Sequence, residues 1–391
     1  MGLVEAVGPA IQSNPALERS MCGWLLLCAN DVVVEDALAQ LWSPESDAAE
    51  AAAAGLREAL RRSPTDPGRW CDLGTALQRS GASDEAGYCF EQALRFGPHS
   101  PPILLRAAFF YDEAQRVPES RAAFRRVLQL ARDYDPIVFG YFERTEQPVE
   151  EVLEGAIPDE AEPLIAYFRF QVGWANPGEL AVIWRRLVER GLTDSLLLAE
   201  YVRRQIAGHR LEDAVAAQAA FVGGVTDEWP ERNLIFNGGF EDDFLGTDLS
   251  WSITERDGML INRTTDVSHT GNYSLHIRFG GGVNVNFRDL SQAFVAAPGR
   301  YRCTAFVRSE NLTTDRGISL RIHDPADQQR LNLSSEEICG TKEWTELSID
   351  LSVTGEPRLL KIEVERSPSR MFDNKISGSV WIDDVACVAI Q

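Results

Sequence analysis

The residue types that carry most enzyme chemistry are few and widely spaced in this chain. There are five histidines, and no two of them have the HxxxH or HExxH spacing of a helical zinc site. The GxSxG nucleophile elbow, the Walker phosphate loop and the dinucleotide-binding glycine fingerprint are all absent from the sequence. A glycosidase would need a pair of carboxylates in a catalytic domain of its own. We therefore expect a protein that is not an enzyme and that works through binding surfaces.

The cysteines do not predict a metal site either. The seven cysteines are Cys22, Cys28, Cys71, Cys89, Cys303, Cys339 and Cys387. No two of them are spaced as CxxC, so a zinc site of the usual kind is not expected. An odd number leaves at least one free thiol, and the wide spacing favours single buried cysteines over a disulfide framework.

Length and charge limit the class of protein and its partners. The 391 residues suffice for two domains, and the formal net charge is −21. Residues 1–230 hold 21 basic and 35 acidic residues, and residues 231–391 hold 17 and 24, so both halves are acidic. Neither half has the basic surface that binding to a phosphate backbone requires, which excludes nucleic acid as an expected partner.

One apolar run lies near the N-terminus. Residues 21–29 are too few to span a bilayer, and Glu5, Glu18 and the single cation Arg19 do not form the basic flank of a signal peptide. We interpret the run as part of a buried helix and expect no membrane span in this chain. The protein is then cytoplasmic, or it is extracytoplasmic (periplasmic or in the cell envelope) with an export segment outside this sequence.

Residues 1–228 are predicted to form helices, because they are rich in Ala, Leu, Arg and Glu with apolar residues at helical spacing. Within them one stretch resembles the tetratricopeptide repeat at nearly every signature position. The matching residues are Trp70, Leu73, Gly74, Leu77, Ala86, Phe90, Ala93 and Pro98. The resemblance implies an α-solenoid of roughly five or six antiparallel helix pairs whose concave groove binds a protein partner.

Polar positions of the inner helices would line that groove. The candidates for protein binding are Asp72, Gln78, Arg79 and Arg106. An ordinary solvated helix face remains an equal alternative for each of them.

Residues 229–391 are predicted to form a separate antiparallel β domain. After Gly223 and Gly224 the helical pattern stops, and short alternating runs are separated by Gly, Asn, Asp and Pro. The predicted strands are residues 273–279, 282–287, 299–309, 317–323, 345–351, 359–365 and 379–388, with one more near the start of the domain. About eight strands in this length predict a two-sheet β-sandwich or jelly roll.

Three ordered motifs make the β domain more specific. They are Asn233-Leu234-Ile235-Phe236-Asn237-Gly238-Gly239-Phe240-Glu241, His269-Thr270-Gly271-Asn272-Tyr273-Ser274, and Val380-Trp381-Ile382-Asp383-Asp384-Val385. Together they resemble the jelly-roll carbohydrate-binding modules of the galactose-binding-like superfold. The resemblance implies one structural calcium with Glu241 and Asp383 as ligands and Asp384 as a substitute, and calcium favours such hard oxygen ligands. A capped turn without metal is the alternative.

The same resemblance implies a glycan-binding surface of exposed aromatic and polar side chains. The candidates are Trp251, Arg278, Asn284, Asn286, Phe306 and Arg308, and further outward positions are His276, Arg302, Arg321 and His323. Trp251 fits the core equally well, and we interpret Trp344 and Trp381 as packing residues. The several arginines favour an acidic polysaccharide, or a contact with the acidic helical half, over a neutral glycan.

The leading hypothesis is a non-catalytic scaffold or adaptor. Its helical repeats would bind protein and its sandwich a glycan, for instance in bacterial polysaccharide or envelope secretion. The alternative is a purely structural assembly factor whose sandwich has no sugar-binding activity. A carbohydrate-active enzyme whose catalytic domain lies outside this sequence is a third hypothesis.

Overall fold

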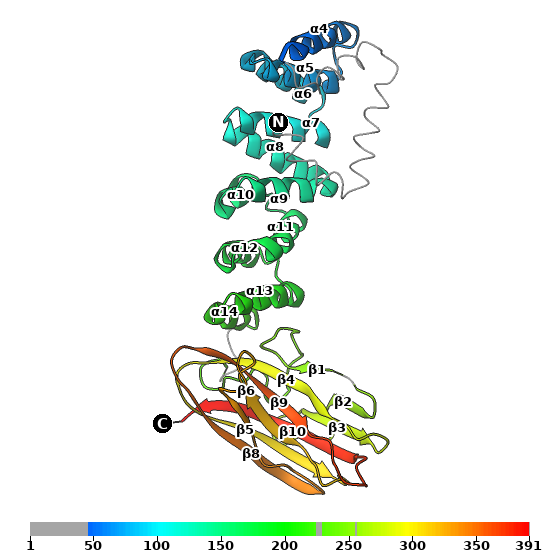
Figure 1. Ribbon diagram of the computed structural model, residues 1–391, viewed down its shortest axis with the longest axis vertical. Helices are drawn as coiled ribbons and strands as arrows, with labels where there is room; N and C mark the ends of the chain where they lie inside the picture. Colours follow the sequence, from blue (N-terminus) through cyan, green and yellow to red (C-terminus); the bar gives the residue numbers. More distant parts are fainter. Residues whose placement is uncertain (1–45, 224–228, 255, 391) are drawn as a thin grey trace. The chain divides into compact units, whose positions relative to one another are not determined.

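The computed structural model describes residues 46–223, 229–254 and 256–390 (Figure 1). The chain divides into two compact units, Met1–Leu192 and Thr193–Gln391. The apolar run at residues 21–29 lies outside the described residues. None of the described helices is both long and apolar enough to cross a bilayer.

The first unit consists of helices that pack as consecutive antiparallel pairs. They are α4 (Ser46–Arg62), α5 (Pro67–Arg79), α6 (Ser83–Phe96), α7 (Pro101–Glu113), α8 (Val117–Leu130), η1 (Arg132–Tyr134), α9 (Asp135–Arg144), α10 (Val149–Gly155), α11 (Ala161–Trp174) and α12 (Pro177–Glu189). Several of these helices have a proline in the first turn. A backbone N–H at this position has no partner within the helix, so a residue that lacks the N–H is tolerated there. Asp66 caps α5 by accepting a hydrogen bond from the N–H of Gly68 at 3.0 Å.

Small residues allow the helices of a pair to approach closely. The α-carbon of Gly74 on α5 lies against the Phe90 ring of α6, and Ala76, Ala86 and Ala93 are completely buried. Phe90 also stacks on Phe110 of α7 with ring centroids 4.3 Å apart. These contacts confirm helix pairs that stack on one another over the stretch around residues 66–130.

One further helix pair, α13 (Ser195–Ala207) and α14 (Leu211–Phe221), belongs to the second compact unit. The secondary structure changes from helix to strand between Phe221 and Ser252. The two compact units, in contrast, divide earlier, between Leu192 and Thr193.

The rest of the second unit is an antiparallel β-sandwich, as predicted. The strands are β1 (Ser252–Ile253), β2 (Met259–Thr264), β3 (Ser274–Gly280), β4 (Phe287–Ala296), β5 (Gly299–Glu310), β6 (Ser319–His323), β7 (Asn332–Ser334), β8 (Lys342–Val353), β9 (Arg358–Arg366) and β10 (Ser377–Ala389). One sheet has the order β1-β4-β9-β6-β7 and the other the order β2-β3-β10-β5-β8. The inward side chains of both sheets form a single core that includes Cys303, Val307, Leu320 and Ile322.

Two strand predictions were wrong. Residues 282–286 form no strand, because Asn284 instead holds the loop to Ser369 through its side chain. The strand lies next to them at Phe287–Ala296, where a register shift between Phe287 and Leu290 interrupts the alternation of apolar residues. Strand β7 was also missed, and two strands, β1 and β2, lie near the start of the domain, where one was expected.

The cysteine interpretation was wrong for one pair. Cys303 on β5 and Cys387 on β10 are directly opposite each other, completely buried and joined by a disulfide. Among the other described cysteines, Cys71 and Cys89 are buried thiols, as expected, and Cys339 is half-buried. Burial raises the pKa of the Cys89 thiol to about 11, so it is protonated and unreactive at neutral pH.

The packing at Gly74 gives a direct test of the helix pairs. A Cβ at Gly74 would lie 2.8 Å from Cε2 of Phe90, whereas at Gly87 the nearest atom would lie 3.9 Å away. Gly74→Ala should destabilise the helices by about 1–3 kcal/mol, because overpacking outweighs the gain in helix propensity. Gly87→Ala, the matched control, should be neutral or stabilise by up to about 1 kcal/mol. Equal urea midpoints of the helical circular-dichroism signal for both variants would contradict the packing.

Candidate functional site

The sandwich has two outward faces of different chemistry. We call the outward side chains of β4, β9, β6 and β7 the charged face. Its polar members are Arg288, Ser291, Ser319, Arg321, His323, Asn332, Ser334, Lys361, Glu363 and Glu365, and Ala293 and Val295 of β4 lie on the same side. We call the outward side chains of the other sheet the aromatic face, with members His276, Arg278, Phe306, Arg308, Trp344 and Trp381.

Alternation along β6 and β9 creates the charged face. Leu320 and Ile322 point into the core, so Arg321 and His323 must point away from it. On the neighbouring strand β9, Glu363 lies directly opposite Arg321. The exposed fractions of Arg321, His323 and Glu363 are only 6%, 4% and 6%, so these outward side chains are nevertheless buried.

Glu363 is the centre of the charged face. Its Oε2 accepts a hydrogen bond from Nη1 of Arg321 at 2.8 Å. Its Oε1 lies 3.2 Å from Nε2 of His323 and 3.3 Å from Nζ of Lys361. Burial by itself raises the pKa of Glu363, but the hydrogen bonds and charges of His323 and Lys361 outweigh it, and the net pKa is lowered. Glu363 is therefore ionised at neutral pH.

Arg321 is held from the side of β7 as well. Its Nε donates to Oδ1 of Asn332 at 2.8 Å and its Nη2 to Oε1 of Gln328 at 3.2 Å. A second carboxylate on β9, Glu365, accepts from the hydroxyl of Ser334 at 2.8 Å and lies 3.3 Å from Nε of Arg288. The charged face thus contains two hydrogen-bonded groups, one around Glu363 and one around Glu365, which together span four strands.

The buried imidazole of His323 is poorly satisfied. Among the residues that the structure describes, neither of its ring nitrogens makes a well-formed hydrogen bond, although Nε2 lies 3.2 Å from Oε1 of Glu363. A buried imidazole nitrogen without a partner carries a desolvation penalty of about 1–3 kcal/mol. A ligand hydroxyl would relieve that penalty.

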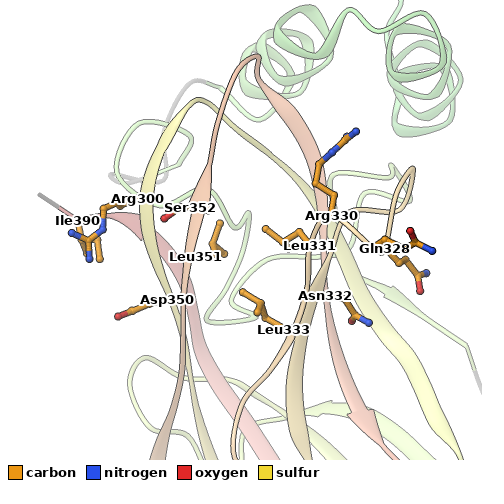
Figure 2. A pocket seen from close by; sticks show the side chains of 11 residues that line it. Arg300, Gln328, Arg330, Leu331, Asn332, Leu333, Asp350, Leu351, Ser352 and Ile390 are labelled. Carbon is orange, nitrogen blue, oxygen red and sulfur yellow. The ribbon is translucent and has the colours of Figure 1, made fainter.

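A pocket of about 490 Å³ adjoins this network (Figure 2). Figure 2 shows Asp350, Leu351 and Ser352 of the edge strand β8 on one side, and Leu331, Asn332 and Leu333 on the other. Gln328 and Asn332 belong both to the pocket lining and to the hydrogen bonds of Arg321. A ligand in the pocket would therefore contact residues that position Arg321.

Three of the predicted glycan-binding residues do lie together, on the aromatic face. They are Arg278, Phe306 and Arg308. The ring faces there are already covered. His276 stacks on Trp381 with centroids 4.7 Å apart, and the guanidinium of Arg308 lies 5.5 Å from the Trp381 centroid. The ring of His269 covers Phe306 at 3.8 Å. These rings offer little open surface to a sugar ring.

The other three predicted glycan-binding residues do not join that group. Trp251 is 2% exposed, and its Nε1 donates to the carbonyl of Asn237 inside the core, so a glycan cannot reach it. Asn284 is occupied with Arg366 and Ser369, and Asn286 is exposed on the same loop. Trp251 therefore belongs to the core, which was one of the two alternatives for it, and Asn284 holds a loop.

The predicted calcium ligands form a hydrogen-bonded clasp. Oε1 of Glu241 accepts from the N–H groups of Asn272 and Tyr273 at 2.7 and 2.9 Å. Asp383 accepts from the N–H of His269 at 2.7 Å, and Asp384 from Oγ1 of Thr270 at 2.7 Å. At least one oxygen of each carboxylate thus accepts a hydrogen bond. The described residues include no group of three or more His, Cys, Asp or Glu that could hold a metal.

Two of the four predicted groove residues, Asp72 and Arg106, bond to each other. Asp72 is buried, and its Oδ1 accepts from Nη1 of Arg106 at 2.7 Å, so the two residues join α5 to α7. Gln78 donates to Glu113 across the same two helices, and Arg79 lies in the last turn of α5. Burial raises the pKa of Asp72, although the charge of Arg106 opposes the rise. Asp72, Arg106 and Gln78 thus connect α5 with α7.

Arg321 and His323 were predicted to point outward, but on the same surface as the residues of the aromatic face. Lys361, Glu363 and Glu365 were not predicted as site residues. One signal was available: polar residues alternate with apolar ones in two predicted strands, 317–323 and 359–365. That the two strands are neighbours could not be derived from the sequence, because β6 and β9 are far apart in the chain.

No protein-family model and no curated protein matches the chain. Several solved structures are similar to part of it. The family 61 carbohydrate-binding module TmCBM61 in complex with β-1,4-galactotriose is 20% identical, with a TM-score of 0.30, over 41% of this chain and 100% of that one. The CBM22-1 and GH10 modules of endo-1,4-β-D-xylanase 10B from Clostridium thermocellum are 13% identical, with a TM-score of 0.29, over 41% and 29%.

The CBM22-1 xylan-binding domain from Paenibacillus barcinonensis is 14% identical, with a TM-score of 0.24, over 36% of this chain and 86% of that one. With identities of 20% or less and TM-scores of 0.30 or less, these likenesses carry no inference about function.

Removing Glu363 should unfold the charged face. Glu363→Ala leaves Arg321 buried without its carboxylate, which should cost about 3 kcal/mol. Glu346→Ala, an exposed glutamate on β8, is the matched control and should stay within about 0.5 kcal/mol. Because the pKa of Glu363 is lowered on folding, its contribution is present above its ordinary pKa of 4.5 and is lost as the pH falls below that value. Urea unfolding at neutral and acidic pH measures both effects, and equal stabilities of the two variants would refute the assignment.

The clasp at Glu241, Asp383 and Asp384 makes a prediction about calcium. A calcium ion present at a hundred times its Kd would stabilise the folded chain by about 2.7 kcal/mol. Because donors already face these carboxylates, we expect the same unfolding temperature in excess calcium and in EDTA. A calcium-dependent rise that the Glu241→Gln variant abolishes would show instead that the clasp rearranges around the metal.

Proposed function

We propose that the protein is a non-catalytic scaffold whose β-sandwich binds a glycan on the charged face and whose helices bind a protein partner. The observation that supports glycan binding is the network of buried, mutually bonded polar side chains on the outward side of a sheet. A sandwich core does not need such residues, and buried ion pairs add little net stability. Their presence is better explained by a ligand.

The network has hydrogen-bonding capacity left for sugar hydroxyls. The guanidinium of Arg321 has five N–H donors in all, and three acceptors engage it. Lys361 has three donors and a side chain that is 36% exposed. With the exposed guanidinium of Arg288, the face offers donors at fixed positions, which suits a ligand with several hydroxyl groups.

The charges favour an acidic glycan. Arg288, Arg321 and Lys361 are cations, and only Glu363 and Glu365 oppose them, so the face is slightly positive within a chain of net charge −21. The described outward residues of this face include no aromatic ring on which a neutral sugar would stack. A polysaccharide that contains uronic acids matches both properties.

Two further parts of the proposal rest on other observations. Protein binding by the helices is supported by stacked pairs, which create extended surfaces. An extracytoplasmic compartment is supported by the disulfide between Cys303 and Cys387, because structural disulfides persist where the environment is oxidising. The sequence motifs that would indicate catalysis are absent.

The alternative function is structural assembly without sugar binding. The covered rings of the aromatic face favour it, because they use the sandwich's aromatic surface for internal packing. Under this alternative the charged face would only stabilise the fold.

Glycan binding can be measured on an array of neutral and uronic-acid polysaccharides with the full chain. We expect retention on the uronic-acid members that weakens as salt is added. Lys361→Ala and Arg288→Ala remove half-exposed cations of the charged face and should each weaken binding about tenfold, or about 1.4 kcal/mol. Arg302→Ala is the matched control, because Arg302 is exposed and ion-paired on the other sheet.

Two results would contradict the proposal. Absence of binding to every polysaccharide would favour the structural alternative. Binding that Arg302→Ala weakens as much as Lys361→Ala does would move the site to the other sheet.

A further inference from the structure

His323 is a buried histidine of the charged face. It is the last residue of β6, its side chain points away from the sandwich core, and only 4% of it is exposed. A buried residue can act on a binding surface through its neighbours if its charge changes. Histidine is the side chain whose charge ordinarily changes between about pH 5 and 8. The neighbours of His323 therefore decide what a proton on its ring would do.

His323 and Lys361 share one carboxylate oxygen. Nε2 of His323 lies 3.2 Å from Oε1 of Glu363, and Nζ of Lys361 lies 3.3 Å from the same atom. The other oxygen, Oε2, accepts a hydrogen bond from Arg321 at 2.8 Å. The register of β6 and β9 causes the sharing, because it places His323 directly opposite Lys361. One carboxylate is thus divided among a buried guanidinium, an accessible ammonium and a ring whose charge depends on pH.

The charged neighbours of His323 come from its own strand, from the residue after it and from β9. They are Arg321, Asp324, Lys361 and Glu363. On the other side, β7 places the neutral Asn332 opposite His323. The carboxylate of Asp324 is compensated elsewhere, because Nη1 of Arg330 and Nη1 of Arg358 lie 3.4 and 3.6 Å from its Oδ2. A proton on His323 therefore acts mainly on Glu363 and Lys361.

A proton on His323 weakens the attraction between Glu363 and Lys361. Three cations then surround the carboxylate, and one negative charge cannot compensate all of them. Lys361 is the cation that can leave, because its side chain is flexible and 36% exposed, whereas His323 and Arg321 are buried. Its ammonium then turns toward solvent, where an anion can bind it. The charged face also gains one positive charge.

We propose that His323 is a positioning residue of the glycan site, which when protonated releases Lys361 from Glu363 to bind a carboxylate of an acidic glycan. The inference rests on the proposed binding of an acidic glycan by the charged face and specifies how pH regulates it. Binding strengthens as the pH falls from about 8 to about 5.5, the range in which imidazoles take up a proton. Carboxylates of the glycan stay ionised there, because carboxyl groups ordinarily titrate near pH 4, at about 3.3–4.3.

The affinity of the full chain for an oligomer of galacturonic acid, measured by calorimetry at about pH 8 and about pH 5.5, tests the proposal. The wild type should bind about threefold to tenfold more tightly at the lower pH. His323→Gln should lose this difference, because its amide takes up no proton. The matched control, His276→Gln on the other sheet, should keep it. Asp135 and Asp383, whose pKa values burial raises to about 6, titrate in the same range but remain in both variants.

A second measurement needs neither glycan nor variant. The chain has only three lysines, Lys342, Lys361 and Lys375, so their side-chain NMR signals can be assigned. In a pH titration of the free wild-type chain, the Lys361 signals should shift with the same midpoint as the His323 ring.

The outcomes separate this inference from the proposed function. Lys361 signals that do not follow His323, or a pH dependence of glycan affinity that a folded His323→Gln variant retains, would overturn the inference and leave glycan binding intact. Absence of glycan binding at both pH values would overturn the proposed function, and with it the role of His323 in binding.

Discussion

Glu363 is the residue on which the charged face depends, because an ionised carboxylate at 6% exposure must be compensated on every side. Arg321, His323 and Lys361 supply that compensation, and each of them comes from β6 or from β9 itself. Arg321 is fixed in turn by Asn332 and Gln328, which connect the network to the pocket at the edge of the sandwich. The charged face therefore depends on two things: the buried carboxylate of Glu363 needs compensating partners, and the pairing of β6 with β9 places those partners beside it.

The two faces of the sandwich differ in how their side chains are bonded. On the aromatic face the large rings pack against side chains of the same face: His276 stacks on Trp381, and His269 stacks on Phe306. The charged face satisfies its charges internally but retains donors and a free imidazole nitrogen. Residual hydrogen-bonding capacity, rather than the presence of aromatic residues, distinguishes the face that is suited to a ligand.

Much of the fold could be predicted from the sequence, and the failures have physical causes. Helix pairs follow from small residues such as Gly74 opposite large ones such as Phe90. Strand β4 was misplaced because a bulge disrupts its alternation, and Trp251 was ambiguous because its indole N–H finds a backbone carbonyl inside the core. The charged face was missed because the pairing of β6 with β9 depends on topology, which alternation along single strands does not encode.

The central claim is that a glycan binds on the charged face through its accessible cations, Arg288 and Lys361. The most direct measurement is an NMR titration of the full chain with an oligomer of galacturonic acid, observing the side-chain resonances of arginine, lysine and histidine. Binding on the charged face predicts saturable shifts at Arg288 and Lys361, with His276 and Arg308 unchanged. Shifts confined to His276 and Arg308, or no shifts at all, would contradict it.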